Sequence, residues 1–308
     1  MPSSPSATLP RFAFLTPRVL PPASKIEGRV AVLDVAFASE GGGASFEKTT
    51  LPFIRGLGGR LAAWVDHHDH DRHADYVGDP RFVLTTKAEH GACPELVTPE
   101  VVRAAGPVDT VAMHLDLDGI FSGAKWVLGG IEPYEGADAD ARAIDTRRGE
   151  PGPIANRIDR ALRARFRDET LKHRVIQYLL SRGKDQVLWG EIEEAAREID
   201  PLLDESKRLA DKYEIIDGVA FVEAAGRPYD KTELLLIGQE KSPVAVVRDS
   251  GSLTIAADFE SGLDFVKMFE MGGGMPTRVT VPEARRAEVM AKLAAAVAAR
   301  ARPAGGVV

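Results

Sequence analysis

The chain has one cysteine, no excess of positive charge and no apolar run long enough to span a bilayer. A lone Cys93 excludes an intramolecular disulfide framework and fits a reducing compartment. Without a membrane-spanning run, the expected location is the cytoplasm, and no membrane partner is expected. The formal net charge of −7 argues against stable binding to duplex nucleic acid, which depends on Lys and Arg neutralising phosphates. Small phosphorylated substrates held by metal ions remain compatible with this charge.

Residues 1–25 are rich in proline and lack a basic start followed by a continuous apolar run and a cleavage site, so they make a poor signal peptide. We expect a loose N-terminal segment. Within it, the apolar residues of RFAFL (11–15) either add an edge strand or pack on the surface.

A βα pattern begins at residue 28. GRVAVLDVAFA (28–38) contains a β-branched apolar run that ends in Asp34, and RLAAWV (60–65) is a second short apolar strand. Between them lies a helical stretch that Ser45 could cap, and FVLTT (82–86) predicts a third short strand. Near-continuous apolar strands separated by helices are typical of buried parallel strands. The sequence therefore predicts an α/β fold with a doubly wound, mostly parallel N-terminal sheet.

The segment WVDHHDHDRH (64–73) holds four of the seven histidines and three aspartates. Imidazole and carboxylate groups bind transition-metal ions of borderline hardness. The preceding strand would deliver Asp66, His67 and His68 to its C-terminal end, where open α/β sheets build their sites. These three residues are therefore candidate site residues. A solvated loop of mixed charge is the alternative interpretation for any one of them.

A second group of polar residues lies in VDTVAMHLDLDGIFSGAKW (108–126). The segment begins as a strand, and the alternation predicts His114, Asp116 and Asp118 on one side of an extended backbone. Gly119 permits a tight turn, and Asp118 can cap the helix that follows. Two carboxylates and an imidazole at the end of an apolar strand are costly unless their charge is compensated. Metal ligands are therefore favoured over a solvated strand end.

Four short motifs together resemble the signature motifs of the DHH phosphoesterase superfamily: HLDLDG (114–119), VDHH (65–68), the strand-end Asp34 and AIDT (143–146). This superfamily includes RecJ-like single-strand exonucleases, nanoRNases, cyclic-dinucleotide phosphodiesterases and manganese-dependent pyrophosphatases. The resemblance covers roughly residues 28–150, and no single motif carries it alone.

The order of these motifs differs from that of the family. The HxDxDG strand usually comes first, but here it follows the lone aspartate and the DHH motif. A parallel sheet tolerates this order because each βα unit delivers its residues to one common edge. We therefore expect a circularly permuted arrangement. The alternative is that one motif is accidental, which would remove part of the metal site.

The resemblance implies a two-metal site for Mn²⁺, with Mg²⁺ or Co²⁺ as substitutes, in which the ions activate a bridging water. Asp66 would orient His67, and His68 would lie beside the substrate phosphate. His70, Arg72, His73 and His90 match no family motif, so loop solvation or hydrogen bonds to ligands are favoured over direct catalysis. The implied ligands are His114 and Asp116 for the first ion, His67, Asp118 and Asp145 for the second, and Asp34 as the bridge.

The C-terminal part contains FEMGGGMPTRVTV (269–281), which resembles the glycine-rich motif of the DHH-associated domain that binds the nucleotide part of the substrate. Gly272, Gly273 and Gly274 can bring backbone amides close to an anion, and Arg278 can bond a phosphate oxygen. A tight turn is the alternative for the glycines. For Arg278, the alternatives are exposure to solvent or pairing with a surface carboxylate.

These patterns predict four parts: a loose segment (1–25), a metal-binding catalytic domain (26–150), a connector of amphipathic helices (151–215) and a smaller α/β substrate-binding domain (216–308). The predicted function is metal-dependent hydrolysis of phosphodiester bonds in nucleotides or short single-stranded oligonucleotides. A phosphatase for pyrophosphate or a nucleotide bisphosphate, and a non-catalytic nucleotide-binding sensor, are the alternatives. A homodimer is compatible with the sequence.

Overall fold

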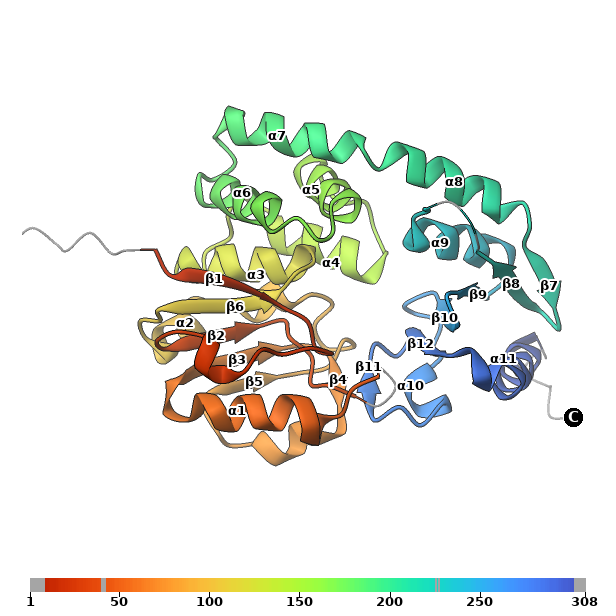
Figure 1. Ribbon diagram of the computed structural model, residues 1–308, viewed down its shortest axis with the longest axis horizontal. Coiled ribbons are helices and arrows are strands. Elements are labelled where there is room, and N and C mark those ends of the chain that lie inside the picture. The colour runs from red at the N-terminus through yellow and green to blue at the C-terminus, as the bar shows by residue number, and fades with distance from the viewer. Residues whose placement is uncertain (1–8, 40–42, 225, 227, 302–308) are drawn as a thin grey trace, which may run out of the picture.

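The computed structural model describes residues 9–39, 43–224, 226 and 228–301, which form two lobes side by side (Figure 1). The first lobe is built on a five-stranded parallel sheet and is followed by helices. The second is built on a five-stranded mixed sheet with helices on it. This architecture confirms the predicted α/β fold.

The first sheet has the strand order β1-β6-β2-β3-β5, and every neighbouring pair is parallel. Its strands are β1 (Arg11–Leu15), β2 (Val30–Leu33), β3 (Leu61–Asp66), β5 (Phe82–Leu84) and β6 (Thr110–His114). RFAFL therefore adds an edge strand, one of the two outcomes expected for it. The strand expected over residues 28–38 is shorter, because Asp34 takes a left-handed φ of 58° and turns the chain directly after Leu33.

Both faces of the first sheet are buried under helices. Successive residues of a strand point to opposite faces. Val30 and Val32 pack in one hydrophobic cluster with Phe53 from α1 (Leu51–Leu57), and Leu33 packs in another with residues of α3 (Leu117–Val127). This two-sided burial explains why the strands are apolar along their whole length.

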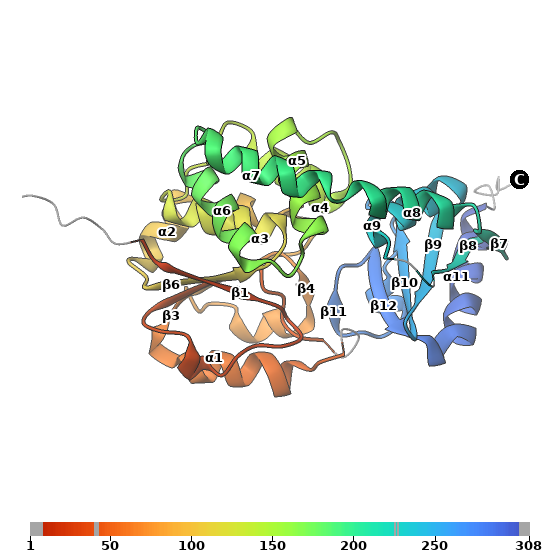
Figure 2. The same ribbon diagram turned by 45° about the horizontal axis from the view of Figure 1, so that its top comes forward.

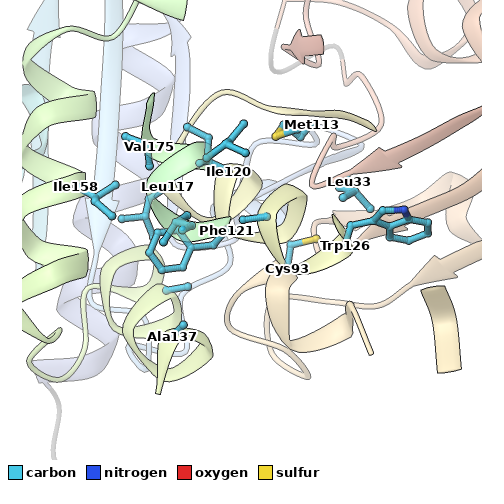
Figure 3. Close-up of a cluster of buried hydrophobic side chains, with 14 of the residues drawn as sticks. Leu33, Cys93, Met113, Leu117, Ile120, Phe121, Trp126, Ala137, Ile158 and Val175 are labelled. Atoms are coloured by element: carbon cyan, nitrogen blue, oxygen red, sulfur yellow. The ribbon is translucent and has the colours of Figure 1, made fainter. Parts of the chain in front are cut away.

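The helices predicted within residues 151–215 are present. They are α5 (Pro153–Ala164), α6 (Glu169–Leu180), α7 (Gln186–Arg197) and α8 (Asp200–Ala210), and they follow α4 (Ala137–Thr146). Figure 3 shows Phe121 of α3 close to Ile158 of α5 and Val175 of α6, all within one buried cluster. Cys93 belongs to the same cluster and is fully buried. Helices α5 and α6 thus share the hydrophobic core of the first lobe, and α8 runs on from α7 towards the second lobe (Figure 1).

The second sheet has the strand order β12-β10-β9-β8-β7, in which only β8 and β9 are parallel neighbours. One face packs on α9 and the other on α10 and α11. Its elements are β7 (Glu214–Ile216), β8 (Val219–Glu223), α9 (Lys231–Lys241), β9 (Val244–Asp249), β10 (Ser252–Ala257), α10 (Phe265–Met268), β12 (Arg278–Pro282) and α11 (Arg286–Ala301).

A two-stranded ribbon joins the lobes beside the first sheet. Strand β4 (Asp69–His70) pairs antiparallel with β11 (Gly273–Gly274), and both strands lie between the lobes in Figure 2. Arg163 of α5 also pairs with Asp230 at the start of α9, with 2.6 Å between Nη2 and Oδ1. The domain boundaries stay a prediction, and residues 1–8 of the expected loose segment lie outside the described residues. Among the described helices, none has the length and apolar character needed to cross a membrane.

Candidate metal centre

The candidate site lies at the carboxyl ends of three adjacent parallel strands. His114 is the last residue of β6, Asp34 follows β2, and Asp66 is the last residue of β3. Because β2 lies between β6 and β3, Asp34 is central. The expectation that these strand ends meet at one edge of a parallel sheet is confirmed.

Asp34 contacts a histidine on each side. Its Oδ1 lies 3.3 Å from His67 Nε2, and its Oδ2 lies 3.6 Å from His114 Nδ1. His67 Nε2 is also 3.3 Å from Asp118 Oδ2 and 3.7 Å from Asp145 Oδ2. Asp34 thus lies between the two expected ligand sets, which is the position that a bridging carboxylate requires.

Three groups of side chains could each hold an ion, since their ligand atoms lie within 4.8 Å of one another. Together they contain every residue that we expected as a ligand, and also His68. The groups are Asp34 with His67 and His68, Asp34 with His114 and Asp116, and His67 with Asp118 and Asp145.

Several carboxylate oxygens in this site fit a metal ion because they have no hydrogen-bond donor. Among the described residues, no group donates a hydrogen bond to either oxygen of Asp34 or to Oδ1 of Asp116. Burial raises the pKa of Asp34, and the nearby charges of Asp118 and Asp116 raise it further. A bound cation would remove this cost, since it compensates buried negative charge. His114 and Asp116, with Asp34, therefore form a donor set of the kind that divalent transition ions take.

Asp118 reaches the site from a helix. We expected it to cap that helix and to alternate with His114 and Asp116 along a strand, and both expectations are wrong. The strand ends at His114, and Asp118 lies in the first turn of α3. The turn between strand and helix is so tight that only glycine fits at position 119, because a Cβ there would lie 2.4 Å from the carbonyl oxygen of His114. Burial would raise the pKa of Asp118, but its hydrogen bond with His67 and the charge of Lys87 hold that pKa well below its usual range.

The two histidines of the DHH motif form hydrogen bonds with different partners. His68 Nδ1 lies 2.8 Å from Asp66 Oδ1, whereas His67 Nδ1 lies 2.9 Å from the backbone oxygen of His90. Our expectation that Asp66 orients His67 is therefore wrong. Neighbouring side chains of an extended segment point in opposite directions, so residues 66 and 68 share a side. Because His67 Nδ1 donates to a carbonyl, its Nε2 faces the carboxylates, the arrangement that favours metal binding.

Lys87 is a member of the site that the motifs did not indicate. Its side chain is only 2% exposed, its Nζ pairs with Asp145 Oδ2, and Nζ lies 3.1 Å from His67 Nε2. Burial and the charge of Lys87 lower the pKa of His67, but its close contacts with the carboxylates of Asp118 and Asp34 raise it to about 9. Lys87 follows β5 by three residues, at the same edge of the sheet as the ligands. The predicted strand over 82–86 was the signal that could have found it.

The other residues of the histidine-rich segment lie outside the ligand groups. His70 and His73 pack edge-on against Phe37, with ring centroids 5.6 and 5.1 Å away. Arg72 pairs with Glu47 at 2.5 Å. His90 contributes its backbone oxygen, as described above. These contacts stabilise the loop around the site, and of this segment only His67 and His68 belong to the ligand groups.

A cavity of about 390 Å³ separates the ligand groups from the second lobe. One side is lined by His68, Lys87, His114, Asp116 and Asp145, and the other by Gly273, Gly274 and Arg278. Gly272 lines a neighbouring hollow instead. Expected site residues from both lobes thus line one common space, whereas Asp34, Asp66, His67 and Asp118 lie behind its lining.

Arg278 is a half-buried cation facing this cavity. Its guanidinium donates to Thr232 Oγ1 at 3.3 Å, and it forms no ion pair within the described part of the chain. Burial lowers the pKa of Arg278 to about 10, and the charge of Arg147 acts in the same direction. Neither alternative for this residue, exposure to solvent or pairing with a surface carboxylate, is what the structure has.

Gly273 and Gly274 form strand β11, which pairs with β4. From the sequence we had expected either a contact with an anion or a tight turn. A Cβ on Gly273 would lie 2.4 Å from Cδ2 of His70 and 3.0 Å from the backbone oxygen of Asp69. The missing side chain therefore lets β11 approach β4. The glycines hold the second lobe against the segment that carries the DHH motif.

Comparison with known proteins gives distant structural likenesses only. No protein-family model and no curated protein matches the sequence. A RecJ exonuclease bound to manganese is 15% identical with a TM-score of 0.36, covering 61% of this chain and 56% of that one. RecJ with Mg²⁺ from Thermus thermophilus is 14% identical with a TM-score of 0.37, covering 65% and 35%. The pGpG-specific phosphodiesterase PggH from Vibrio cholerae is 11% identical with a TM-score of 0.44, covering 89% and 99%.

RecJ and PggH belong to the DHH superfamily, the family that the motifs of this chain resemble. The chain spans about half or less of the two RecJ chains. Each TM-score is below 0.5, so what the site can do follows from its own residues.

Proposed function

We propose that this protein is a metal-dependent phosphoesterase that hydrolyses phosphodiester bonds of nucleotides or short single-stranded oligonucleotides. The observation that carries the proposal is the cavity between the lobes. It has residues of the metal-ligand groups on one side and, on the other, the half-buried Arg278, which has no ion-pair partner among the described residues. Divalent ions bound at the ligand groups would activate a water molecule and neutralise charge on the phosphoryl oxygens.

The side chains of this protein would supply the remaining functions. Asp34, His114 and Asp116 would hold an ion, and a set of imidazole and carboxylate ligands suits Mn²⁺, with Mg²⁺ or Co²⁺ as substitutes. Arg278 would form a charge-assisted hydrogen bond with a phosphate oxygen. His68, held by Asp66, would lie beside the same phosphate.

The size of the cavity favours a nucleotide unit as substrate. A volume of about 390 Å³ lies within the range of about 300 to 1,000 Å³ that is usual for small-ligand sites. The net charge of −7 argues against stable contact with a long duplex. Dinucleotides and the ends of short single strands satisfy both conditions.

Hydrolysis assays on a panel of substrates test the proposal. The metal-free protein is supplied with Mn²⁺ and given short oligonucleotides, linear and cyclic dinucleotides, a nucleotide bisphosphate and pyrophosphate. We expect the phosphodiesters to be hydrolysed faster than the phosphomonoesters and pyrophosphate. Preference for the bisphosphate or pyrophosphate would identify a phosphatase. Nucleotide binding without turnover of any substrate would identify a sensor.

We also propose that the catalytic unit is circularly permuted relative to the family. The strands that carry the three motifs, β6, β2 and β3, are neighbours in the sheet although their motifs occur in a different order in the sequence. A permutation would preserve this spatial arrangement. The cytoplasmic location and the homodimer stay predictions.

A further inference from the structure

A buried lysine lies among the side chains expected to hold the second metal ion. Lys87 Nζ pairs with Asp145 Oδ2 and lies 3.1 Å from His67 Nε2, so it contacts two of the three side chains expected to hold the second ion. Within the described part of the chain, Lys87 forms no ion pair with Asp34 or Asp116. The two ligand sets therefore differ in their electrostatic surroundings.

Lys87 is held in this position by its surroundings. Its side chain is 2% exposed, and its backbone N–H donates to Asp69 Oδ2 at 3.2 Å. A buried ammonium group needs negative partners. Asp145 is such a partner directly, and Asp118 is close enough for the charge of Lys87 to lower its pKa. Lys87 thus compensates the same carboxylates that an ion at this position would compensate.

An ion and the lysine ammonium would compete for the same space. A transition ion lies about 2.0 to 2.2 Å from its nitrogen and oxygen ligands. Since Nζ is 3.1 Å from His67 Nε2, an ion on that nitrogen would lie within about 5 Å of Nζ. Like charges at this separation in a buried site repel each other strongly. One ligand oxygen, Asp145 Oδ2, is also already engaged by Lys87.

We propose that the ammonium group of Lys87 replaces the second metal ion, so that the protein binds one divalent ion tightly, at Asp34, His114 and Asp116. The proposal rests on the metal centre of the proposed function and changes its stoichiometry, since the resemblance to the DHH superfamily implies two ions. Lys87 also lines the cavity, so its charge faces the same space as Arg278.

Metal stoichiometry tests this proposal without any substrate. The full chain is stripped with a chelator, titrated with Mn²⁺ by calorimetry, and analysed for bound manganese after dialysis. Electron paramagnetic resonance separates a mononuclear six-line spectrum from that of an exchange-coupled pair. The wild-type protein should bind one tight ion with a six-line spectrum. Lys87→Met, which keeps the length of the side chain and removes its charge, should bind two, the second at least about tenfold more tightly than in the wild type.

Lys125→Met is the matched control. Lys125 is also buried, at 5% exposed, and its Nζ pairs with Asp138 at 2.5 Å, but it belongs to none of the ligand groups. Its variant loses a buried charge of the same kind and should still bind one ion. A second ion gained only by the Lys87 variant therefore reports on the position of that charge and not on a general loosening of the fold.

Two results would overturn the proposal: two tight ions in the wild-type protein, or a folded Lys87→Met protein that still binds only one. If circular dichroism shows that Lys87→Met does not fold, the wild-type stoichiometry decides alone. A wild-type protein that binds one ion and hydrolyses no phosphodiester would leave this inference standing and would refute the proposed function. The two failures are therefore distinguishable.

Discussion

The two walls of the cavity differ in their polar side chains and in the kind of sheet that carries them. The first-lobe wall presents carboxylates and imidazoles at the ends of parallel strands, within a core buried on both faces. The second-lobe wall presents Arg278 at the start of β12, in an antiparallel part of the other sheet. This difference predicts different kinetic effects. Substitutions in the first wall should lower kcat, whereas substitutions in the second wall should raise KM.

The largest effect is expected from Asp34→Ala. This change removes the central carboxylate of two ligand groups, so hydrolysis should fall by more than about 100-fold, beyond the loss usual for residues that only support a ligand. The fold should persist, because a buried carboxylate without hydrogen-bond donors costs stability. Steady-state assays and circular dichroism measure the two effects. Asp71→Ala, an exposed carboxylate in the histidine-rich segment, is the control; near wild-type turnover in Asp34→Ala would contradict the central role of this residue.

Arg278→Ala tests the second wall. Loss of a charge-assisted bond to phosphate should raise KM for a dinucleotide by about 10- to 100-fold and change kcat less, the pattern of lost uniform binding. Arg285→Ala serves as the control, because Arg285 pairs with Glu288 and does not line the cavity. If KM is unchanged while metal binding is intact, the substrate is recognised by other residues. The second wall would then not have the binding role assigned to it.

Asp66→Asn should have a smaller effect on the first wall. Asp66 belongs to none of the ligand groups, but its Oδ1 holds His68 Nδ1 at 2.8 Å. Loss of this support should lower kcat by roughly tenfold, the lower end of the effect of residues that orient a ligand. Bound manganese, measured after dialysis, should not change. A large loss of metal would mean that Asp66 supports the ligands themselves.

The smallest effect is expected at the contact between the lobes. Burial would raise the pKa of Asp230, but its hydrogen bonds from Arg163 and the positive charge of that residue lower it. A carboxyl group with a depressed pKa in the folded state stabilises the protein above its unfolded pKa, and this stability is lost as the pH falls through the folded pKa. Asp230→Asn should therefore lower Tm at pH 7, with a cost of about 1 to 3 kcal/mol. The difference from wild type should shrink as the pH falls below about 4. A difference that does not depend on pH would exclude this ion pair as its cause.

The parts of the site that could be predicted follow from one rule, that parallel strands end at a common edge of the sheet. This rule brought Asp34, Asp66 and His114 together without knowledge of the strand order. The position of Asp118 could not be predicted, because the chain turns from strand into helix within four residues after His114 and the alternation of a strand no longer applies. Lys87 was missed because a lysine after a three-residue strand is ordinarily exposed, and only the packing of the tertiary structure buries this one.

The glycines show a similar limit. The sequence indicates that the backbone of residues 272–274 can approach another group closely, but it does not identify that group. In the structure the neighbour of Gly273 is His70. Spacing along the chain cannot specify a partner two hundred residues away in the other lobe.

The pairing of β4 with β11 has a consequence for the order of steps in the proposed reaction. Asp69 and His70 follow His68 directly, and they form the ladder with Gly274 and Gly273. A movement that widens the cavity must either break this short ladder or pull the DHH segment with it. In the first case the escape of product depends on the rate at which two residue pairs separate. In the second, each opening would displace His68 from its place beside the phosphate in the proposed reaction. The protein could then not act on a new substrate until the lobes closed again.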